Sequence, residues 1–370
     1  MLKEGKIGIY EGFALIFISN ISGLFLSLPS SLMEDGKSMI WLTFSMVILV
    51  TMLNLVIVNL LMKRHDDTTI IEASEQILGR YLGILAGLIL AAYFIMREAF
   101  LFRSYSEAFL LSTLPRTPIS IVLITIATAA IVSAHYGLEI IARVARICLT
   151  FIVLGIVTVL LLTMPNISPN YIFPLFVEDP LKIIGNSVLS YSVTSEVLVP
   201  GLILHAMGGW RFAAKISFWA ILCGGSIILI ASIMILLTFG VQAGSELTLP
   251  FYETSKLIAF GRFLQRMEPV FLLTWAMVGF LKSALYLYLS TVILSRIFKL
   301  SDYRPLLWII TLLCFVIAIL PPDYPSTLEL EGIMLGTVGF IPVLIIPLFL
   351  LIISIIRNLG VNAGSPRNDP

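Results

Sequence analysis

Hydrophobic residues run along the chain in long blocks that are separated by short polar or charged stretches. A helix needs about 20 predominantly apolar residues to cross a bilayer core, and about ten blocks reach or approach this length. Their expected ranges are 10–32, 38–62, 81–113, 118–136, 143–164, 182–206, 213–240, 268–298, 305–320 and 331–356. The pattern predicts an all-α polytopic membrane protein, in which the long third and eighth helices tilt or project beyond the bilayer.

Polar residues interrupt two of these blocks near their middle. The first block contains "SNISGLFLSLP" (19–29), and the sixth contains "NSVLSYSVTSEVLVPG" (186–201). Unwound backbone is tolerated at membrane depth only where protein or a water-filled cavity satisfies its polar groups. We therefore expect the first and the sixth helices to be broken.

The two breaks fall at matching positions in the two halves of the chain. Ten helices divide into two sets of five, and an odd number per half gives the halves opposite orientations, as in transporters built from inverted repeats. We expect one transmembrane domain (1–358) with repeats at about 8–165 and 180–357, followed by a disordered polar tail (359–370). The breaks would then face each other across a site near the bilayer midplane.

Small polar residues also have a simpler role in membrane helices. Ser, Thr and Gly let neighbouring helices pack closely, so either break alone could be a packing feature. Gly23 could admit a neighbouring helix, or it could let a ligand carboxylate reach exposed backbone N–H groups. Both explanations stay open from sequence, although matched breaks favour a binding site.

The composition excludes a water-soluble globular protein. Hydrophobic residues make up 59% of the chain, charged residues only 12%, and the mean hydropathy is +1.03, so the lipid bilayer is its first partner. A net charge of +1 gives no reason to expect nucleic acid. Cysteines and histidines stand apart, which predicts no metal site, no disulfide and no cofactor. No catalytic motif lies at membrane depth, so we do not expect an enzyme.

Basic residues set the expected orientation. Lysine and arginine gather near the amino terminus, near the carboxyl terminus and in every second connection between the expected helices, which favours cytoplasmic termini. These residues are Lys3, Lys6, Lys63, Arg64, Arg80, Arg143, Arg146, Arg211, Lys215, Arg296, Lys299, Arg304, Arg357 and Arg367. No small-residue cleavage site follows the first apolar run, so we expect it to be a retained helix.

Four segments carry a resemblance to a known family. They are "GLFLSLP", "HYGLEIIARVARI", "SYSVTSEVLVPGLILHAM" and "QRMEPVFLLTWAMVGFLKSALYLYLS". In this order and spacing the chain resembles the B subunits of spore nutrient germinant receptors, a branch of the amino acid/polyamine/organocation permease superfamily. The resemblance covers nearly the whole chain and implies a ten-helix fold like that of the bacterial leucine transporter.

The resemblance also implies a function and a site. A family member would bind an amino acid or similar nutrient in a midplane cavity of the inner endospore membrane and signal to A and C receptor subunits. The alternative is a secondary amino acid or amine transporter with alternating access. By superfamily analogy, Ser22 and Gly23 match the unwound first-helix segment, and Ser190, Tyr191 and Ser192 match that of the sixth. With neighbouring residues, the predicted ligand-binding set is Asn20, Ser22, Gly23, Leu24, Ser190, Tyr191, Ser192 and Thr194.

Six charged residues fall well inside the expected helices, away from the helix ends. Each would cost roughly 2.5–3.5 kcal/mol at the bilayer centre, and equal numbers of each sign predict mutual pairing. They are Arg97, Glu98, Arg103, Glu107, Glu196 and Lys282. The spacing of Arg103 and Glu107 favours a local pair.

Among these charges, Glu98, Glu196 and Lys282 are the candidates for a coupling role. By analogy with the fold of sodium-coupled relatives, Lys282 would approach the first helix, where its ammonium could replace a coupling cation. It could equally pair with Glu98 or Glu196. Tyr286, four residues further along, is expected to be a packing or interfacial anchor.

Overall fold

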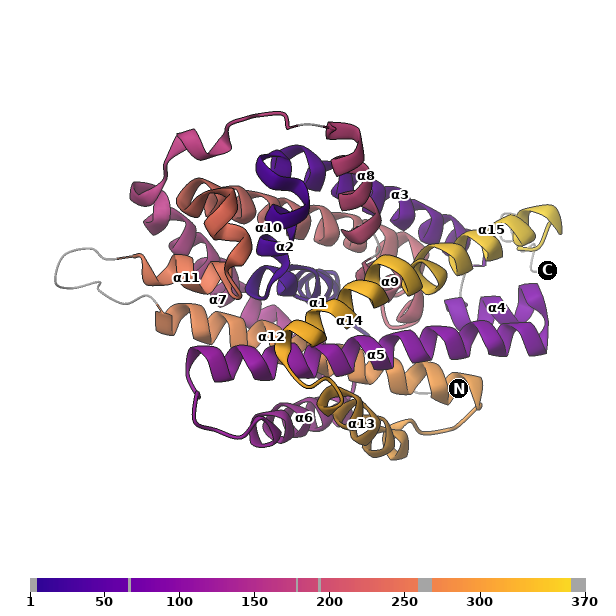
Figure 1. The fold of residues 1–370 in the computed structure, drawn as a ribbon. Coiled ribbons are helices and arrows are strands. Elements are labelled where there is room, and N and C mark those ends of the chain that lie inside the picture. The colour runs from indigo at the N-terminus through magenta and orange to yellow at the C-terminus, as the bar shows by residue number, and fades with distance from the viewer. Residues whose placement is uncertain (1–4, 66–67, 178, 192–193, 259–267, 361–370) are drawn as a thin grey trace, which may run out of the picture.

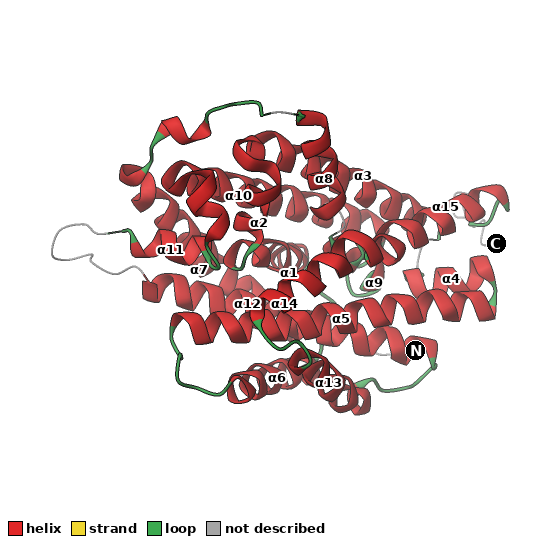
Figure 2. Ribbon diagram, viewed as in Figure 1, coloured by secondary structure: helices red, strands yellow, loops and turns green. Residues whose placement is uncertain are grey.

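The structure is a computed structural model that describes residues 5–65, 68–177, 179–191, 194–258 and 268–360. Within these ranges the chain forms helices and loops, with no strand (Figure 2). The α-helices are α1 (Ile9–Ile21), α2 (Leu28–Gly36), α3 (Ile40–Arg64), α4 (Ile70–Leu78), α5 (Arg80–Ser112), α6 (Ile119–Tyr136), α7 (Leu138–Thr163), α8 (Pro180–Tyr191), α9 (Val199–Leu202), α10 (Trp210–Glu246), α11 (Pro250–Lys256), α12 (Glu268–Ile297), α13 (Arg304–Ile319), α14 (Tyr324–Ile333) and α15 (Ile346–Ile356).

Helices occupy all ten of the predicted ranges within the described residues. Seven helical stretches are long and apolar enough to cross a membrane, and one of them, Leu28–Arg64, joins α2 to α3. Two shorter apolar helices are Ile9–Phe25 and Arg304–Ile319. The first span combines α1 with α2, the sixth combines α8 with α9, and the tenth runs from α14 to α15 through the π-helical turns η6 (Met334–Val338) and η7 (Ile341–Ile345).

Both predicted helix breaks occur, and each is a 3₁₀ turn followed by a helix with proline in its first turn. After α1, the 3₁₀ turn η1 (Ser22–Phe25) leads into α2, which has Pro29 in its first turn. After α8, the 3₁₀ turn η5 (Ser195–Val197) leads into α9, which has Pro200 in its first turn. Proline has no N–H to donate inside a helix but is tolerated in the first turn. In each span the proline therefore begins a new helix instead of continuing the old one.

Two helices begin earlier than the sequence predicts. The tenth span starts at Tyr324 and not near residue 331, because the Asp323 carboxylate accepts a hydrogen bond from the Ser326 N–H at 2.8 Å. An aspartate in this position replaces a missing helical partner, so "PPDYPST" contains a helix start as well as a turn. α7 begins at Leu138, five residues before the expected position.

The long helices α5 and α12 pack against each other in the middle of the bundle (Figure 1). They have 33 and 30 residues, which confirms that the third and eighth spans are longer than the about 20 residues that cross a bilayer core. Gly279 of α12 lies against Tyr105 of α5, and a Cβ atom at this glycine would be only 2.0 Å from the Tyr105 ring. The ring cannot easily yield because it stacks on Trp275 at 5.4 Å between ring centroids.

We expect Gly279→Ala to destabilise the protein by overpacking, which typically costs about 1–3 kcal/mol in a well-packed core. Thermal unfolding of the purified protein in detergent measures this effect. The matched control is Gly185→Ala in α8, where no atom lies within 4 Å of the added Cβ. Equal unfolding temperatures for the two variants would contradict the close contact between α5 and α12.

The two ends of the described chain meet at one face of the bundle, which we call the terminal face (Ile7, Ala206, α4 and Arg357). The Ile7 N–H donates to the Ala206 carbonyl at 2.9 Å, and Arg357 donates to the Ile77 carbonyl of α4 at 2.9 Å. α4 and the end of α15 lie at the right of Figure 1, and α11 lies at the left, on the opposite face.

Short helices occur in both long connections on the opposite face. They are the 3₁₀ turn η4 (Pro169–Ile172) and α11. Near the carboxyl end of the described chain, the Leu359 carbonyl accepts a hydrogen bond from Arg64 at 3.4 Å. Residues 361–370 of the expected tail lie outside the described residues.

Candidate functional site: a charged cavity at the helix breaks

A cavity of about 400 Å³ lies beside the two helix breaks. Its lining mixes apolar side chains, such as Phe44, Val47 and Ile228, with polar and charged ones. The polar and charged lining residues are Asn20, Ser27, Ser31, Asp35, Thr51, Arg97, Ser104, Ser190, Thr194, Glu196, Lys282 and Glu331. Because α2 and α14 contribute to the wall, the cavity extends from the breaks toward the opposite face.

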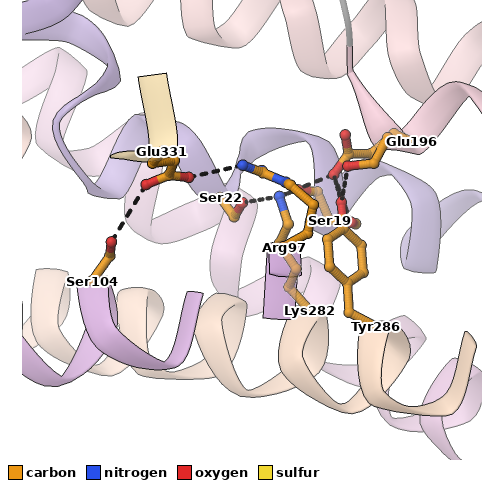
Figure 3. Close-up of polar contacts among 9 residues, drawn as sticks. Ser19, Ser22, Arg97, Ser104, Glu196, Lys282, Tyr286 and Glu331 are labelled. Carbon is orange, nitrogen blue, oxygen red and sulfur yellow. Dashed lines mark hydrogen bonds and ion pairs between the residues drawn. The ribbon is translucent and has the colours of Figure 1, made fainter. Parts of the chain in front are cut away.

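Lys282 joins both broken spans to α12. Its Nζ lies 2.9 Å from Glu196 Oε1 in the sixth span, and both side chains are only 5% exposed. The same ammonium donates to Ser22 Oγ at 2.7 Å and to the Ser19 carbonyl at 3.1 Å, both in the first span (Figure 3). Of the two partners predicted for Lys282, the structure therefore selects Glu196.

The Glu196 carboxylate is further satisfied by hydroxyl groups. Its Oε1 accepts hydrogen bonds from Tyr286 at 2.6 Å and from Ser19 at 2.9 Å. Ser195 also lies 2.6 Å from the Tyr286 hydroxyl. Tyr286 is buried and packs edge-to-face on Phe94 at 5.4 Å between ring centroids, as its expected packing role requires, but the sequence did not predict the hydrogen bond from its hydroxyl to Glu196. A buried ion pair is tolerated only when such additional hydrogen bonds satisfy its remaining groups.

A second ion pair crosses the cavity between α5 and α14. Arg97 Nη1 lies 2.8 Å from Glu331 Oε1, and Ser104 contacts the other oxygen of Glu331 at 3.5 Å (Figure 3). Glu331 was missed from the sequence because this glutamate stands at the very start of the tenth expected helix (331–356), where a charge is ordinarily exposed. The available signal was a glutamate directly before a long apolar run.

The predicted mutual pairing of the six charges is confirmed for four of them. Arg103 and Glu107 form the expected local pair at 2.7 Å, and Lys282 pairs with Glu196. Arg97, however, pairs outside the set, with Glu331 of the tenth span. Glu98 is left over: it is fully buried, and neither of its oxygens has a hydrogen-bond partner among the described residues.

The structure places most of the predicted site residues at the cavity. Asn20, Gly23, Ser190 and Thr194 line it, together with Glu196 and Lys282. Ser22 is buried beneath the Lys282 ammonium, and Leu24 is in the hydrophobic core. The side chain of Tyr191 and the whole of Ser192 lie outside the described residues. Binding of a ligand by these residues stays a prediction.

On the terminal-face side of the breaks, polar contacts tie the helices together. Arg146 pairs with Glu11 at 2.7 Å, Arg296 donates to the Leu202 carbonyl at 2.8 Å, and His205 lies 3.2 Å from Glu72. Burial raises the pKa of the Glu72 carboxyl, but hydrogen bonds from His205 and from the Thr69 backbone amide outweigh burial and lower this pKa to about 2.

Solved structures share this fold at low sequence identity. MhsT, solved in complex with L-phenylalanine, has a TM-score of 0.68 and 12% identity, over 97% of this chain and 99% of that one. Mhp1, a nucleobase-cation-symport-1 family transporter solved with bromovinylhydantoin bound, has a TM-score of 0.64 and 12% identity, over 92% and 78% of the two chains. Together with the matched breaks, these similarities confirm the predicted leucine-transporter-like fold.

Sequence comparison connects the chain to germination proteins. Spore germination protein A2 of Bacillus subtilis (strain 168) is 24% identical over 333 residues, which cover 86% of this chain and 87% of that protein. Spore germination protein KB of the same organism is 22% identical over 303 residues, 80% of each chain. The family model described as "Spore germination protein" matches residues 6–327. The chain therefore belongs to the spore germination protein family, as an integral membrane protein of the permease type.

Proposed function

We propose that this chain is the ligand-binding, permease-like B subunit of a spore nutrient germinant receptor and that its ligand is an amino acid or a similar small nutrient. The observation that carries the proposal is the cavity at the paired helix breaks, which presents charges of both signs. Arg97 and Lys282 can meet a carboxylate, and Glu196 and Glu331 can meet an ammonium group. The shared fold with a protein solved in complex with L-phenylalanine supports this ligand class.

In this proposal, ligand binding changes the conformation of the cavity, and this change is transmitted to A and C subunits in the inner endospore membrane. A working transporter is the second candidate, because the similar solved structures include transporters. Uptake of labelled amino acids into proteoliposomes that contain only this chain separates the two functions. Accumulation driven by an ion gradient would favour the transporter, and binding without accumulation would favour the receptor subunit.

Substitution of Gly23 tests the site. We expect Gly23→Val to abolish ligand binding at normal membrane abundance, because Gly23 lines the cavity and the atom nearest to an added Cβ is the flexible end of Leu28, at 2.9 Å. The measurement is the thermal shift of the purified protein with a panel of L-amino acids. A ligand at a hundred times its Kd stabilises by about 2.7 kcal/mol.

Gly185→Val, in α8 and away from the cavity, is the control for this experiment. It should keep the thermal shift of the unsubstituted chain. Normal amounts of Gly23→Val with an unchanged thermal shift would mean that the first break serves helix packing, and the proposed site would be withdrawn. No thermal shift with any amino acid would instead reject the ligand class.

We further propose that the terminal face is cytoplasmic, since the basic residues gather there. The two ends of α13 provide a matched test with single cysteines. Pro322→Cys on the opposite face should react with an impermeant thiol reagent added to intact membranes, whereas Ser301→Cys on the terminal face should react only after permeabilisation. Both positions are exposed. The reverse labelling pattern would invert the orientation.

A further inference from the structure

Glu98 is a buried acidic residue outside the lining of the cavity. It lies on α5, its exposed fraction is 0%, and it does not line the cavity. Neither carboxylate oxygen has a hydrogen-bond partner among the described residues. Its neighbour in sequence, Arg97, faces the cavity and pairs with Glu331, so α5 presents two consecutive ionisable residues to two different environments.

The ionisable groups around Glu98 come from the helices packed on α5. α12 brings Lys282, next to Ser283, and α13 brings Cys314. α14 brings Glu331, which is already paired, and the glutamates of α4 contact His205 and Lys299 at the terminal face. α6 has no ionisable side chain before His135 near its end. The cations that act on Glu98 are thus Lys282 and Arg97.

Both of these cations are already neutralised. Lys282 lies 2.9 Å from Glu196, and Arg97 lies 2.8 Å from Glu331. An ionised Glu98 would therefore add one uncompensated negative charge to the interior of the bundle. An isolated buried charge is so costly that a titratable group binds or releases a proton instead. We propose that Glu98 is held as a neutral carboxylic acid and is a proton-binding site linked to the Lys282–Glu196 pair.

The link follows from charge balance. If Glu196 is neutralised or moves away, the Lys282 ammonium is left without its counter-ion. Ionisation of Glu98 then restores neutrality: its O–H bond breaks, the electron pair stays on the carboxylate, and one proton passes to solvent. A ligand carboxylate that replaces Glu196 beside Lys282 would keep Glu98 protonated. Proton occupancy at Glu98 therefore depends on the charge state of the cavity.

Infrared spectroscopy of the chain reconstituted in lipid vesicles tests the proposal. At neutral pH the spectrum should contain the carbonyl band of a protonated carboxylic acid, shifted in deuterated water and absent from Glu98→Gln. Glu196→Gln should lose or strongly reduce the same band, because Lys282 would then draw the negative charge onto Glu98. The control is Glu253→Gln, which removes an exposed ion pair with Lys256 and should leave the band unchanged.

Each alternative outcome rejects part of the proposal. If the spectra of the unsubstituted chain and of Glu98→Gln do not differ in the acid carbonyl region, Glu98 is ionised. A band that persists at full intensity in Glu196→Gln would remove the link to the cavity. Glutamine closely matches the neutral acid in shape, so Glu98→Gln should accumulate normally. Loss of this variant while Glu98→Asp accumulates would show that the negative charge is required, and would also overturn the proposal.

Discussion

Replacing Lys282 by methionine is expected to lower the stability of the protein by about 3–5 kcal/mol, because Glu196 would remain as a buried charge without a partner. The substitution also removes the ammonium that contacts both Ser22 and the Ser19 carbonyl at the first break. We therefore expect loss of ligand binding as well as a lower unfolding temperature. Thermal unfolding with and without the amino acid panel measures both effects on one preparation.

Two further variants separate the causes. Lys256→Met removes a surface pair with Glu253, whose side chains are more than a third exposed, and such pairs contribute only about 0–1 kcal/mol. The double variant Lys282→Met with Glu196→Gln leaves no unpaired charge, so it should recover much of the stability but not the ligand binding. Equal, negligible effects of Lys282→Met and Lys256→Met would show that the buried pair has no energetic role.

Neutralising the second ion pair is expected to change which ligands the cavity accepts. Arg97→Gln should weaken binding of carboxylate-containing ligands roughly ten- to a hundredfold, since hydrogen bonds to charged groups contribute about 1.5–3 kcal/mol. Glu331→Gln should act in the opposite sense, weakening ligands with an ammonium group and favouring those with only a carboxylate. The measurement compares an amino acid with the matching amine and the matching carboxylic acid.

Ser104→Ala is the control for this pair, because Ser104 contacts Glu331 only at 3.5 Å. It should leave the order of the three ligands unchanged. If Arg97→Gln and Glu331→Gln weaken all three ligands equally, the pair closes the cavity without contacting the ligand. The proposed charge recognition would then rest on Lys282 and Glu196 alone.

The sequence predicts the helices and their breaks well because both depend on local chemistry. The length of the apolar blocks follows the thickness of the bilayer core. Pro29 and Pro200 interrupt a helix whatever the tertiary packing around them. The start of α14 was missed because it depends on a single capping contact from Asp323. The distribution of apolar residues along the chain does not reveal such a contact.

The charge pairing could not be predicted in the same way. Arg97 and Glu331 are separated by 234 positions in sequence, and their contact depends on how α5 and α14 are rotated about their axes. Tyr286 has the same ambiguity, because an aromatic residue in an apolar helix can point its hydroxyl either to an interface or to a buried carboxylate. Only the packed structure places it 2.6 Å from Glu196.

The Lys282 ammonium is covalently attached to α12, so it differs electrically from a bound, exchangeable cation. The occupancy of a site by a dissolved ion depends on the ion concentration, but a side-chain ammonium fills its position at any sodium or potassium concentration. A carried ion also crosses the membrane voltage, at about 2.3 kcal/mol per elementary charge per 100 mV. The charge on Lys282 never leaves the protein. The contact between Lys282 and the two broken spans therefore forms without a bound sodium or potassium ion.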